Sequence, residues 1–415
     1  MVKVKPFKAV RPGKSLADKV AALPYDVMNS EEAREMVKDN PYSFLHVDKA
    51  EVDLDPAIGL YDEKVYLRAR ENLYQMMENS VLIQDGKDCY YIYKQVMQGR
   101  PQTGLVCCSS IDDYLNNKIK KNEHTRADKE QDRINHVDYC DANTGPIFLT
   151  YKENSRISQI IEQWMASAVP ESDFVSEDGV QQIVWLLDNA ELIAEITRLF
   201  AGMDSLYIAD GHHRTASAAK VGIKRREQNP GYSGDEEFNF FLTVLFPDNQ
   251  LKIMDYNRVV RDLNGLDKDQ FLTKVGEKFS ITPCDGNKPC HPPRPQTYGM
   301  YLDSDWYLLE AKSGIFDLSD PLDSLDVSIL QNNLLRPILD IDDPRTNKRI
   351  DFIGGIRGLA ELERRCQEDM QVAFSLYPTS ISQLISLSDA GQIMPPKTTW
   401  FEPKLRSGLF IHLLK

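Results

Sequence analysis

The chain has 415 residues and a mass of 47.4 kDa, and its 42% apolar and 27% charged residues are typical of a folded globular protein. Lys and Arg number 49 and Asp and Glu number 63, so the formal net charge is −14. This charge disfavours contact with nucleic acid and anionic membranes, and no apolar stretch is long enough to span a bilayer. We therefore expect no nucleic-acid and no membrane partner, and any basic site should be local.

The cysteines and the first residues indicate the compartment. Seven cysteines, an odd number, are scattered along the chain, and residues 1–8 lack the apolar core of a signal peptide. A reduced, cytoplasmic setting is the simplest interpretation. Cys284 and Cys290 lack the spacing of a zinc knuckle, so we interpret them as ordinary loop thiols.

Short strands alternate with helices from the start of the chain. In the first part, apolar spacing and capping residues predict a strand over 2–10, a helix from Asn29 or Ser30, and a helix over 61–79. Two strands, over 89–97 and 103–109, are predicted to pair around a turn. In the middle, they predict strands over 146–151, 181–187 and 205–209, helices over 156–168, 190–200 and 215–226, and a strand over 239–246 that forms a hairpin into 251–260. Later elements are a strand pair over 298–310, a strand over 350–353, helices near 325–335 and 357–365, and a tail rich in turn residues over 394–409.

This alternation predicts a mixed α/β fold. The composition changes at the charged stretch near residue 120 and again near Asn264. We therefore expect three regions, at 1–119, 120–264 and 265–415.

The strongest local signal is Asp210-Gly211-His212-His213-Arg214, which joins a buried strand to an Ala-rich helix. Gly211 permits a close backbone approach, and the first amides of a helix form a ready anion site. Arg214 adds a guanidinium fork that suits phosphate oxygens, and the Thr215 hydroxyl can donate as well. His212 and His213 can donate hydrogen bonds or move a proton near neutral pH.

A purely structural role is the alternative for this loop. Helix capping would account for Asp210 and Gly211, but not for two histidines and an arginine at one place, so we favour an anion or phosphate site. The adjacent side chains of His212 and His213 diverge, so we predict no metal ligand here.

A charged stretch over 123–133 has acids and bases at helical spacing. One interpretation is a solvated helix face with ion pairs one turn apart. The other is a catalytic carboxylate, Glu123, beside phosphate-binding Arg126, Lys129 and Arg133.

Two later segments are further candidates. Arg357 follows a glycine-rich turn after an apolar strand, which indicates either a second anion contact or an ordinary strand–turn–helix. Lys397 lies in the turn-rich tail, which either closes a pocket or fixes the C-terminus through buried Trp400 and Phe401.

Several motifs together resemble a bacterial and archaeal family catalogued as a domain of unknown function, whose members are often labelled ParB-like. The motifs are residues 23–27, 43–47, 209–214, 351–358 and 394–409. The resemblance covers essentially the whole chain.

The Asp210–Arg214 loop is similar to that of free serine kinases of the ParB/sulfiredoxin superfamily, which phosphorylate the hydroxyl of free L-serine. The resemblance implies a ParB/sulfiredoxin-like core with large N- and C-terminal additions. It also implies that the loop binds nucleotide phosphates with Mg²⁺, and that an upstream acid is the base. We assign this acid to Glu123, although Asn122-Glu123-His124 differs from the His-Glu order expected.

The leading hypothesis is a phosphotransferase acting on free serine or O-phosphoserine, working in either direction or as a phosphoserine phosphatase. Its donor would be ATP, ADP or pyrophosphate, with Mg²⁺, and its partner is a small phosphorylated molecule. The predicted catalytic residues are Asp210, Glu123 and His212, and the predicted phosphate-binding residues are Gly211, His213, Arg214, Thr215, Arg126, Lys129, Arg357 and Lys397. The alternatives are a nucleotide-binding, ParB-like regulatory or partition protein without catalysis, and a metal-dependent hydrolase. The sequence predicts no oligomeric state.

Overall fold

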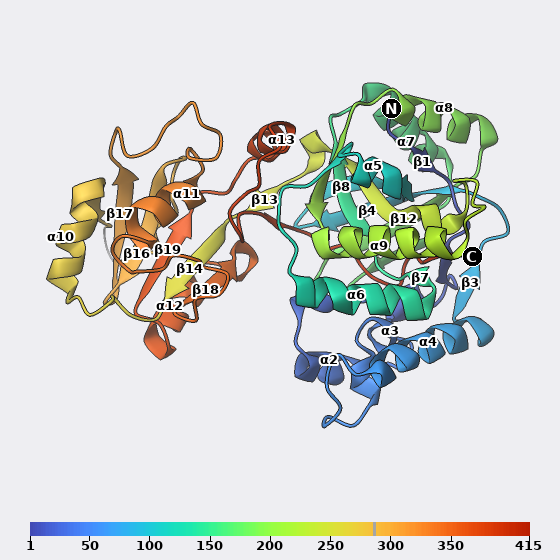
Figure 1. Ribbon diagram of the computed structural model, residues 1–415, viewed down its shortest axis with the longest axis horizontal. Helices are drawn as coiled ribbons and strands as arrows, with labels where there is room; N and C mark the ends of the chain where they lie inside the picture. The colour runs from blue at the N-terminus through green and yellow to red at the C-terminus, as the bar shows by residue number, and fades with distance from the viewer. Residues whose placement is uncertain (285–287) are drawn as a thin grey trace. The chain divides into compact units, whose positions relative to one another are not determined.

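The computed structural model describes residues 1–284 and 288–415, and Figure 1 shows the path of the chain. The chain divides into two compact units. The first comprises Met1–Leu251 and Pro403–Lys415, and the second comprises Lys252–Glu402. Both contain helices and sheets, so the predicted mixed α/β class is confirmed.

This division differs from the three expected regions. Strands from both sides of the boundary expected near residue 120 pair in one sheet, because β5 (Arg100–Ser110) runs antiparallel to β12 (Phe240–Pro247). The end of the chain also returns to the first unit, where β21 (His412–Leu413) pairs with β7 (Ala142–Asn143).

The first unit is built on a nine-stranded sheet with the order β6-β11-β8-β12-β5-β4-β10-β9, in which β1 also pairs with β5. The remaining strands of this sheet are β1 (Val4–Lys5), β4 (Tyr90–Met97), β6 (Ile119–Lys120), β8 (Ile147–Tyr151), β9 (Ser172–Val175), β10 (Gln181–Leu187) and β11 (Leu206–Asp210). β12 is buried along its whole length, as expected for a continuous apolar strand that is covered on both faces. A separate strand pair joins β2 (Val10–Pro12) to β3 (Leu82–Gln84).

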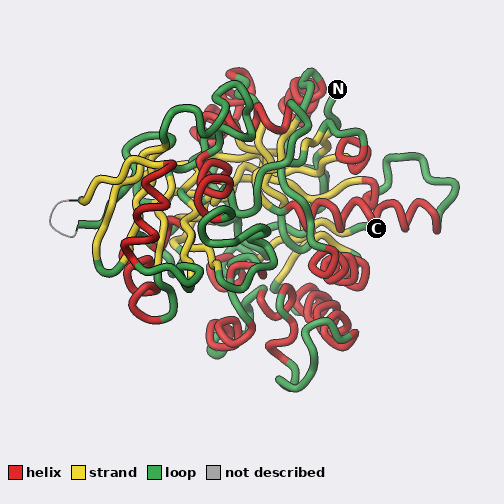
Figure 2. The backbone as a smooth tube through the Cα atoms, turned by 60° about the vertical axis from the view of Figure 1, so that its left-hand side comes forward, coloured by secondary structure: helices red, strands yellow, loops and turns green. Residues whose placement is uncertain are grey.

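Helices cover the strands of this unit, as Figure 2 shows by colour. α6 (Ala127–Cys140) and α9 (His212–Gln228) lie side by side (Figure 1), and the Ser217 hydroxyl of α9 donates to the Glu130 carbonyl of α6 at 3.0 Å. The other helices of the unit are α1 (Ala17–Val20), α2 (Ser30–Val37), α3 (Leu45–Asp48), α4 (Glu63–Glu78), α5 (Ile111–Leu115), α7 (Ser155–Ser167) and α8 (Ala190–Ala201). α4 packs against α6, so a layer of helices lies beyond α6.

The second unit has a six-stranded sheet with the order β15-β17-β16-β19-β14-β18. Its strands are β14 (Tyr256–Val260), β15 (Phe279–Pro283), β16 (Thr297–Leu302), β17 (Asp305–Ala311), β18 (Ile350–Gly354) and β19 (Val372–Leu376). Its helices are α10 (Lys268–Lys278), α11 (Asp326–Leu330), α12 (Ala360–Glu368) and α13 (Ile381–Asp389), and β13 (Ile253–Met254) pairs with β20 (Trp400–Phe401). None of the helices in the described part of the chain is long and apolar enough to cross a membrane.

Many predicted elements are confirmed, and one predicted hairpin is wrong. Asn29 caps α2 in a capping box with Glu32, and β10 has the predicted bounds. The hairpin from 239–246 into 251–260 does not form, because both edges of β12 are already occupied by β5 and β8. β14 instead pairs with β18 and β19 in the second unit.

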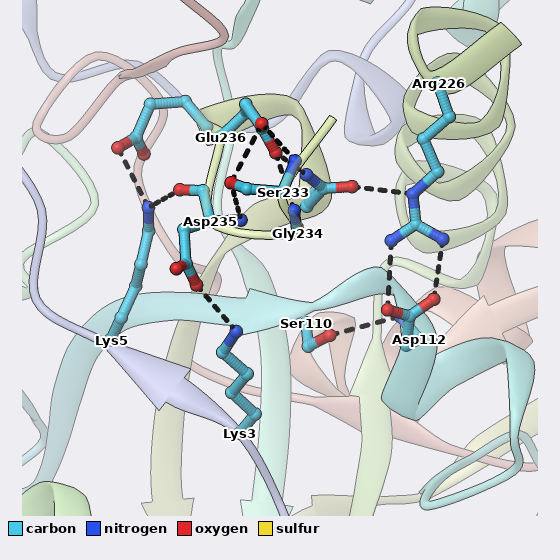
Figure 3. Close-up of polar contacts among 11 residues, drawn as sticks. Lys3, Lys5, Ser110, Asp112, Arg226, Ser233, Gly234, Asp235 and Glu236 are labelled. Atoms are coloured by element: carbon cyan, nitrogen blue, oxygen red, sulfur yellow. Dashed lines mark hydrogen bonds and ion pairs between the residues drawn. The ribbon is translucent and has the colours of Figure 1, made fainter. Parts of the chain in front are cut away.

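A polar network fixes the C-terminal end of α9 (Figure 3). Arg226 donates to both carboxylate oxygens of Asp112, at 2.7 and 3.0 Å. In the loop that follows α9, backbone N–H groups of Ser233 and Gly234 donate to Glu236, which lowers the pKa of Glu236 to about 2. This network links the far end of α9 to α5, and the start of the helix is a separate feature.

Candidate functional site

The site is built where β11 ends and α9 begins. Gly211 lies between the two elements with φ +93° and ψ 32°, in the left-handed region that favours glycine. A Cβ atom at this position would lie 3.1 Å from Nε and 3.2 Å from Nη2 of Arg214. Glycine therefore allows the Arg214 guanidinium to pack directly on the backbone of the loop.

Asp210 is held from two sides. Its Oδ1 accepts a hydrogen bond from the Gly211 N–H at 2.8 Å, and its Oδ2 accepts one from Lys404 Nζ at 3.2 Å. Burial opposes ionisation of this carboxyl, but the charges of Lys404 and Arg214 outweigh burial and lower its pKa well below the usual range. Asp210 is therefore a carboxylate at neutral pH.

Arg214 is a half-buried cation with spare hydrogen-bond donors. Its Nη1 donates to the Pro146 carbonyl, whereas its buried Nε has no hydrogen-bond partner among the described residues. Burial opposes the charge, but Asp26 and Asp210 outweigh burial and raise the pKa of Arg214. A buried donor without a protein partner is uncommon, and Nε is therefore available to an anionic acceptor.

The two histidines reach the segment before α6. Glu123 Oε2 lies 3.9 Å from Nδ1 of His212, which is 7% exposed. Burial lowers the pKa of His212 to about 4, so this ring is neutral at pH 7. His213 Nε2 lies 3.0 Å from the backbone N of Arg126, which donates to it. The structure thus places Glu123 beside the loop, and its part in catalysis stays a prediction.

Three predicted phosphate ligands have other contacts. The buried Thr215 hydroxyl donates to the Gly211 carbonyl at 3.0 Å, so it stabilises the first turn of α9. The Arg126 side chain pairs with Asp128 at 2.9 Å, and Lys129 Nζ donates to the Tyr61 hydroxyl at 3.2 Å. Neither contact is an ion pair one turn apart, and Glu130, Asp132 and Arg133 of the same stretch are buried, so the interpretation as a solvated helix face does not hold for the whole stretch.

Two other predicted ligands belong to the second unit. Arg357 lies 3.8 Å from Glu361, and the ammonium of Lys397 lies 5.6 Å from the ring centre of Tyr256. Their part in the phosphate site stays a prediction.

Lys404 was missed as a site residue. It lies 194 residues beyond Asp210 in sequence, and only the return of the chain into the first unit brings the two together. The one available signal was the unusual C-terminal tail, in which Lys404 follows Lys397.

A small cavity of about 30 Å³ adjoins Arg214. Its lining includes Tyr25 from the 23–27 motif, Asp48 at the end of α3, and Arg133 and His136 from α6. The segments that contain Tyr25 and Arg133 are recognisable in the sequence, but their meeting at a common cavity is not.

Metal ligands do not cluster in the structure. Among residues 1–284 and 288–415, no group of three or more His, Cys, Asp or Glu side chains could hold a metal ion.

A family model described as a protein of unknown function, DUF1015, matches residues 4–328. The chain belongs to the DUF1015 family. This confirms the expected family of unknown function, while the ParB/sulfiredoxin relationship of this DUF1015 protein stays a prediction. No curated protein matches the sequence.

The solved structures that are similar to the DUF1015 chain have both low sequence identity and low TM-scores. A conserved hypothetical protein from Pyrococcus furiosus is 13% identical, with a TM-score of 0.37 over 77% of this chain and 97% of that chain. A free serine kinase in complex with AMP is 12% identical, with a TM-score of 0.38 over 74% and 91% of the two chains. SbnI with a C-terminal truncation, from Staphylococcus aureus, is 10% identical, with a TM-score of 0.40 over 74% and 87%.

Proposed function

We propose that this DUF1015 protein transfers a phosphoryl group to or from the hydroxyl of free serine, with the phosphate held at the start of α9. The observation that carries the proposal is Arg214, which lies at a helix N-terminus and has a buried Nε donor without a partner among the described residues. Helix N-termini and guanidinium forks both favour phosphate oxygens. The resemblance of the Asp210–Arg214 loop to that of free serine kinases supports the same reaction.

The charges around the loop suit phosphoryl transfer, which depends mainly on positioning and on neutralising charge. Arg214 and Lys404 would both attract the phosphate oxygens, and the neutral His212 would interact with them without adding charge. Asp210 is a poor base because its pKa lies far below neutrality. The role of base therefore falls to Glu123, whose side chain is 40% exposed and can meet a substrate hydroxyl.

The residues present also fit a Mg²⁺ ion. Mg²⁺ in proteins is bound by one or two carboxylates together with substrate phosphates, and Asp210 is an ionised carboxylate at the loop. Asp210 would hold the ion, because its contact with Lys404 is a single hydrogen bond that can be replaced. When bound, Mg²⁺ would neutralise part of the charge on the donor phosphates.

The test is an assay for O-phosphoserine. Purified protein is incubated with L-serine, Mg²⁺ and ATP, ADP or pyrophosphate in turn, and the product is measured by mass spectrometry. In the reverse reaction, O-phosphoserine is supplied either alone or together with the product that each donor leaves after giving up one phosphoryl group. We expect turnover with at least one donor, and Arg214→Ala should reduce it by about 100-fold, since hydrogen bonds to charged groups contribute about 1.5–3 kcal/mol each.

Arg226→Ala is the matched control, because it removes an arginine from the same helix whose contacts, with Asp112, Asn239 and Tyr232, all lie away from the loop. It should leave turnover unchanged. Absence of turnover with every donor and in the reverse direction would refute the proposal. Nucleotide binding under those conditions would favour the alternative of a regulatory protein without catalysis.

A further inference from the structure

We propose that the cavity beside Arg214 recognises the head group of a free α-amino acid, with Arg133 and Tyr25 binding the carboxylate and Asp48 binding the ammonium group. This inference rests on the proposed function and names the part of the acceptor that the protein recognises. All of the residues involved belong to the first unit.

Arg133 supplies the first donors. It is 9% exposed, and its Nε and Nη2 both contact the same oxygen of Asp132, at 3.0 and 2.9 Å. A guanidinium carries five N–H donors, so Nη1 keeps two of them, and they have no partner within the described residues. The Arg133 guanidinium also lies 4.0 Å from the ring centre of Tyr25, which fixes its orientation.

Tyr25 and Arg214 add donors on the same cavity. The Tyr25 hydroxyl makes no hydrogen bond to a described residue, and burial raises the pKa of Tyr25, so the hydroxyl keeps its proton. Arg214 contributes to the wall and also faces the loop, so the cavity and the phosphate site share one side chain. An acceptor held in the cavity would therefore lie next to the proposed phosphate.

The opposite charge is provided by Asp48. Its Oδ1 accepts a hydrogen bond from the Thr144 hydroxyl at 2.8 Å and lies 3.6 Å from His136 Nε2, whereas its Oδ2 has no partner in the described part of the chain. Burial and the nearby Arg133 charge lower the pKa of His136, so this ring is neutral at pH 7. Asp48 therefore has a carboxylate oxygen on the cavity that can accept a hydrogen bond from an ammonium group.

Size and charge separate a carboxylate from a phosphate. The cavity measures about 30 Å³. Since one water needs roughly 10–15 Å³ of such space, the cavity has room to enclose the two carboxylate oxygens of the head group but not a whole phosphate group. Asp48 and Asp132 also balance the charges of Arg133 and Arg214, which favours an overall neutral zwitterion over a dianion.

The experiment is a crossed binding measurement by isothermal titration calorimetry, without donor and with the full chain. The probes are L-serine, L-serinamide, which lacks the carboxylate, and 3-hydroxypropionate, which lacks the ammonium group. Arg133→Met should weaken the binding of L-serine and of 3-hydroxypropionate by about 10- to 100-fold, as expected for the loss of a charged hydrogen bond. The affinity for L-serinamide should not change. Asp48→Asn should weaken the binding of L-serine and of L-serinamide to a similar degree, and it should leave the affinity for 3-hydroxypropionate unchanged.

Two further variants keep the test decisive. Tyr25→Phe removes only a hydroxyl without a partner among the described residues, and it should weaken the binding of L-serine by about 5- to 10-fold. Arg226→Met breaks a comparable Arg–Asp pair at the far end of α9, visible in Figure 3, and should not change serine binding. If Arg133→Met does not fold, as judged by circular dichroism, Tyr25→Phe and Asp48→Asn decide the question.

The outcome is independent of turnover. Equal weakening of all three probes, no weakening, or no binding of L-serine to the wild type overturns the head-group site, even if the protein proves to be a kinase. The crossed pattern without turnover supports the head-group site and leaves only the phosphoryl transfer refuted.

Discussion

Replacing Gly211 by alanine tests whether the loop backbone positions Arg214. The left-handed φ of +93° costs a residue with a Cβ atom about 1–2 kcal/mol, and for a unit of this size that lowers Tm by roughly 2–8 °C. The added Cβ would also lie 3.1 Å from Arg214 Nε, so the guanidinium must move. Loss of one charged hydrogen bond to phosphate then predicts a fall in turnover of about 10- to 100-fold.

Gly234→Ala is the matched control for this prediction. Gly234 has a φ of +98° and no atom within 4 Å of an added Cβ, so alanine at this position is strained in its backbone but does not clash with a neighbour. Thermal unfolding should show similar losses for both variants, whereas O-phosphoserine formation should fall only in Gly211→Ala. Equal activity of the two variants would refute the claim that Gly211 positions Arg214 for phosphate.

Three further outcomes are expected. Burial lowers the pKa of His212 from 6.5 to about 4, so on acidification the imidazole is protonated in the unfolded chain before it is protonated in the folded protein. The free energy of unfolding should therefore fall by about 3 kcal/mol as the pH drops from 6.5 to 4. His212→Asn should flatten this part of a denaturation–pH profile, and an unchanged profile would contradict the burial of His212. Lys404→Met should destabilise the protein by about 1–3 kcal/mol at pH 7. The stability difference between the variant and the wild type should shrink as the pH falls below 3.8, because the Asp210–Lys404 pair stabilises the fold only while the Asp210 carboxyl is ionised. A stability difference that does not depend on pH in urea unfolding would argue against this pair. Glu123→Gln should lower kcat by about 10²- to 10⁴-fold with donor affinity unchanged, and a kcat close to that of the wild type would remove Glu123 as the base.

The local part of the site could be predicted from the sequence. The turn at Asp210-Gly211 was expected between a strand and a helix, and the structure confirms both elements. The helix was predicted to begin at residue 215, but it begins at His212, because the left-handed Gly211 reverses the chain within one residue. His212 and Arg214 therefore belong to the first helical turn.

The distant contacts could not be predicted. Lys404 meets Asp210 only because the chain leaves for the second unit and then returns, and no local pattern indicates such a path. The predicted hairpin after β12 failed for a related reason, since strand pairing depends on which edges are already occupied. The cavity likewise joins Tyr25 and Arg133, which are far apart in sequence, so spacing alone could not bring them together.

A crystal structure of the protein in complex with O-phospho-L-serine would reveal the phosphate site and the head-group site together. We expect the phosphate to lie at the first turn of α9 in contact with Arg214, and the carboxylate of the same molecule to contact Arg133. Phosphoserine bound away from Arg214, or no bound phosphoserine at saturating concentration, would contradict this expectation.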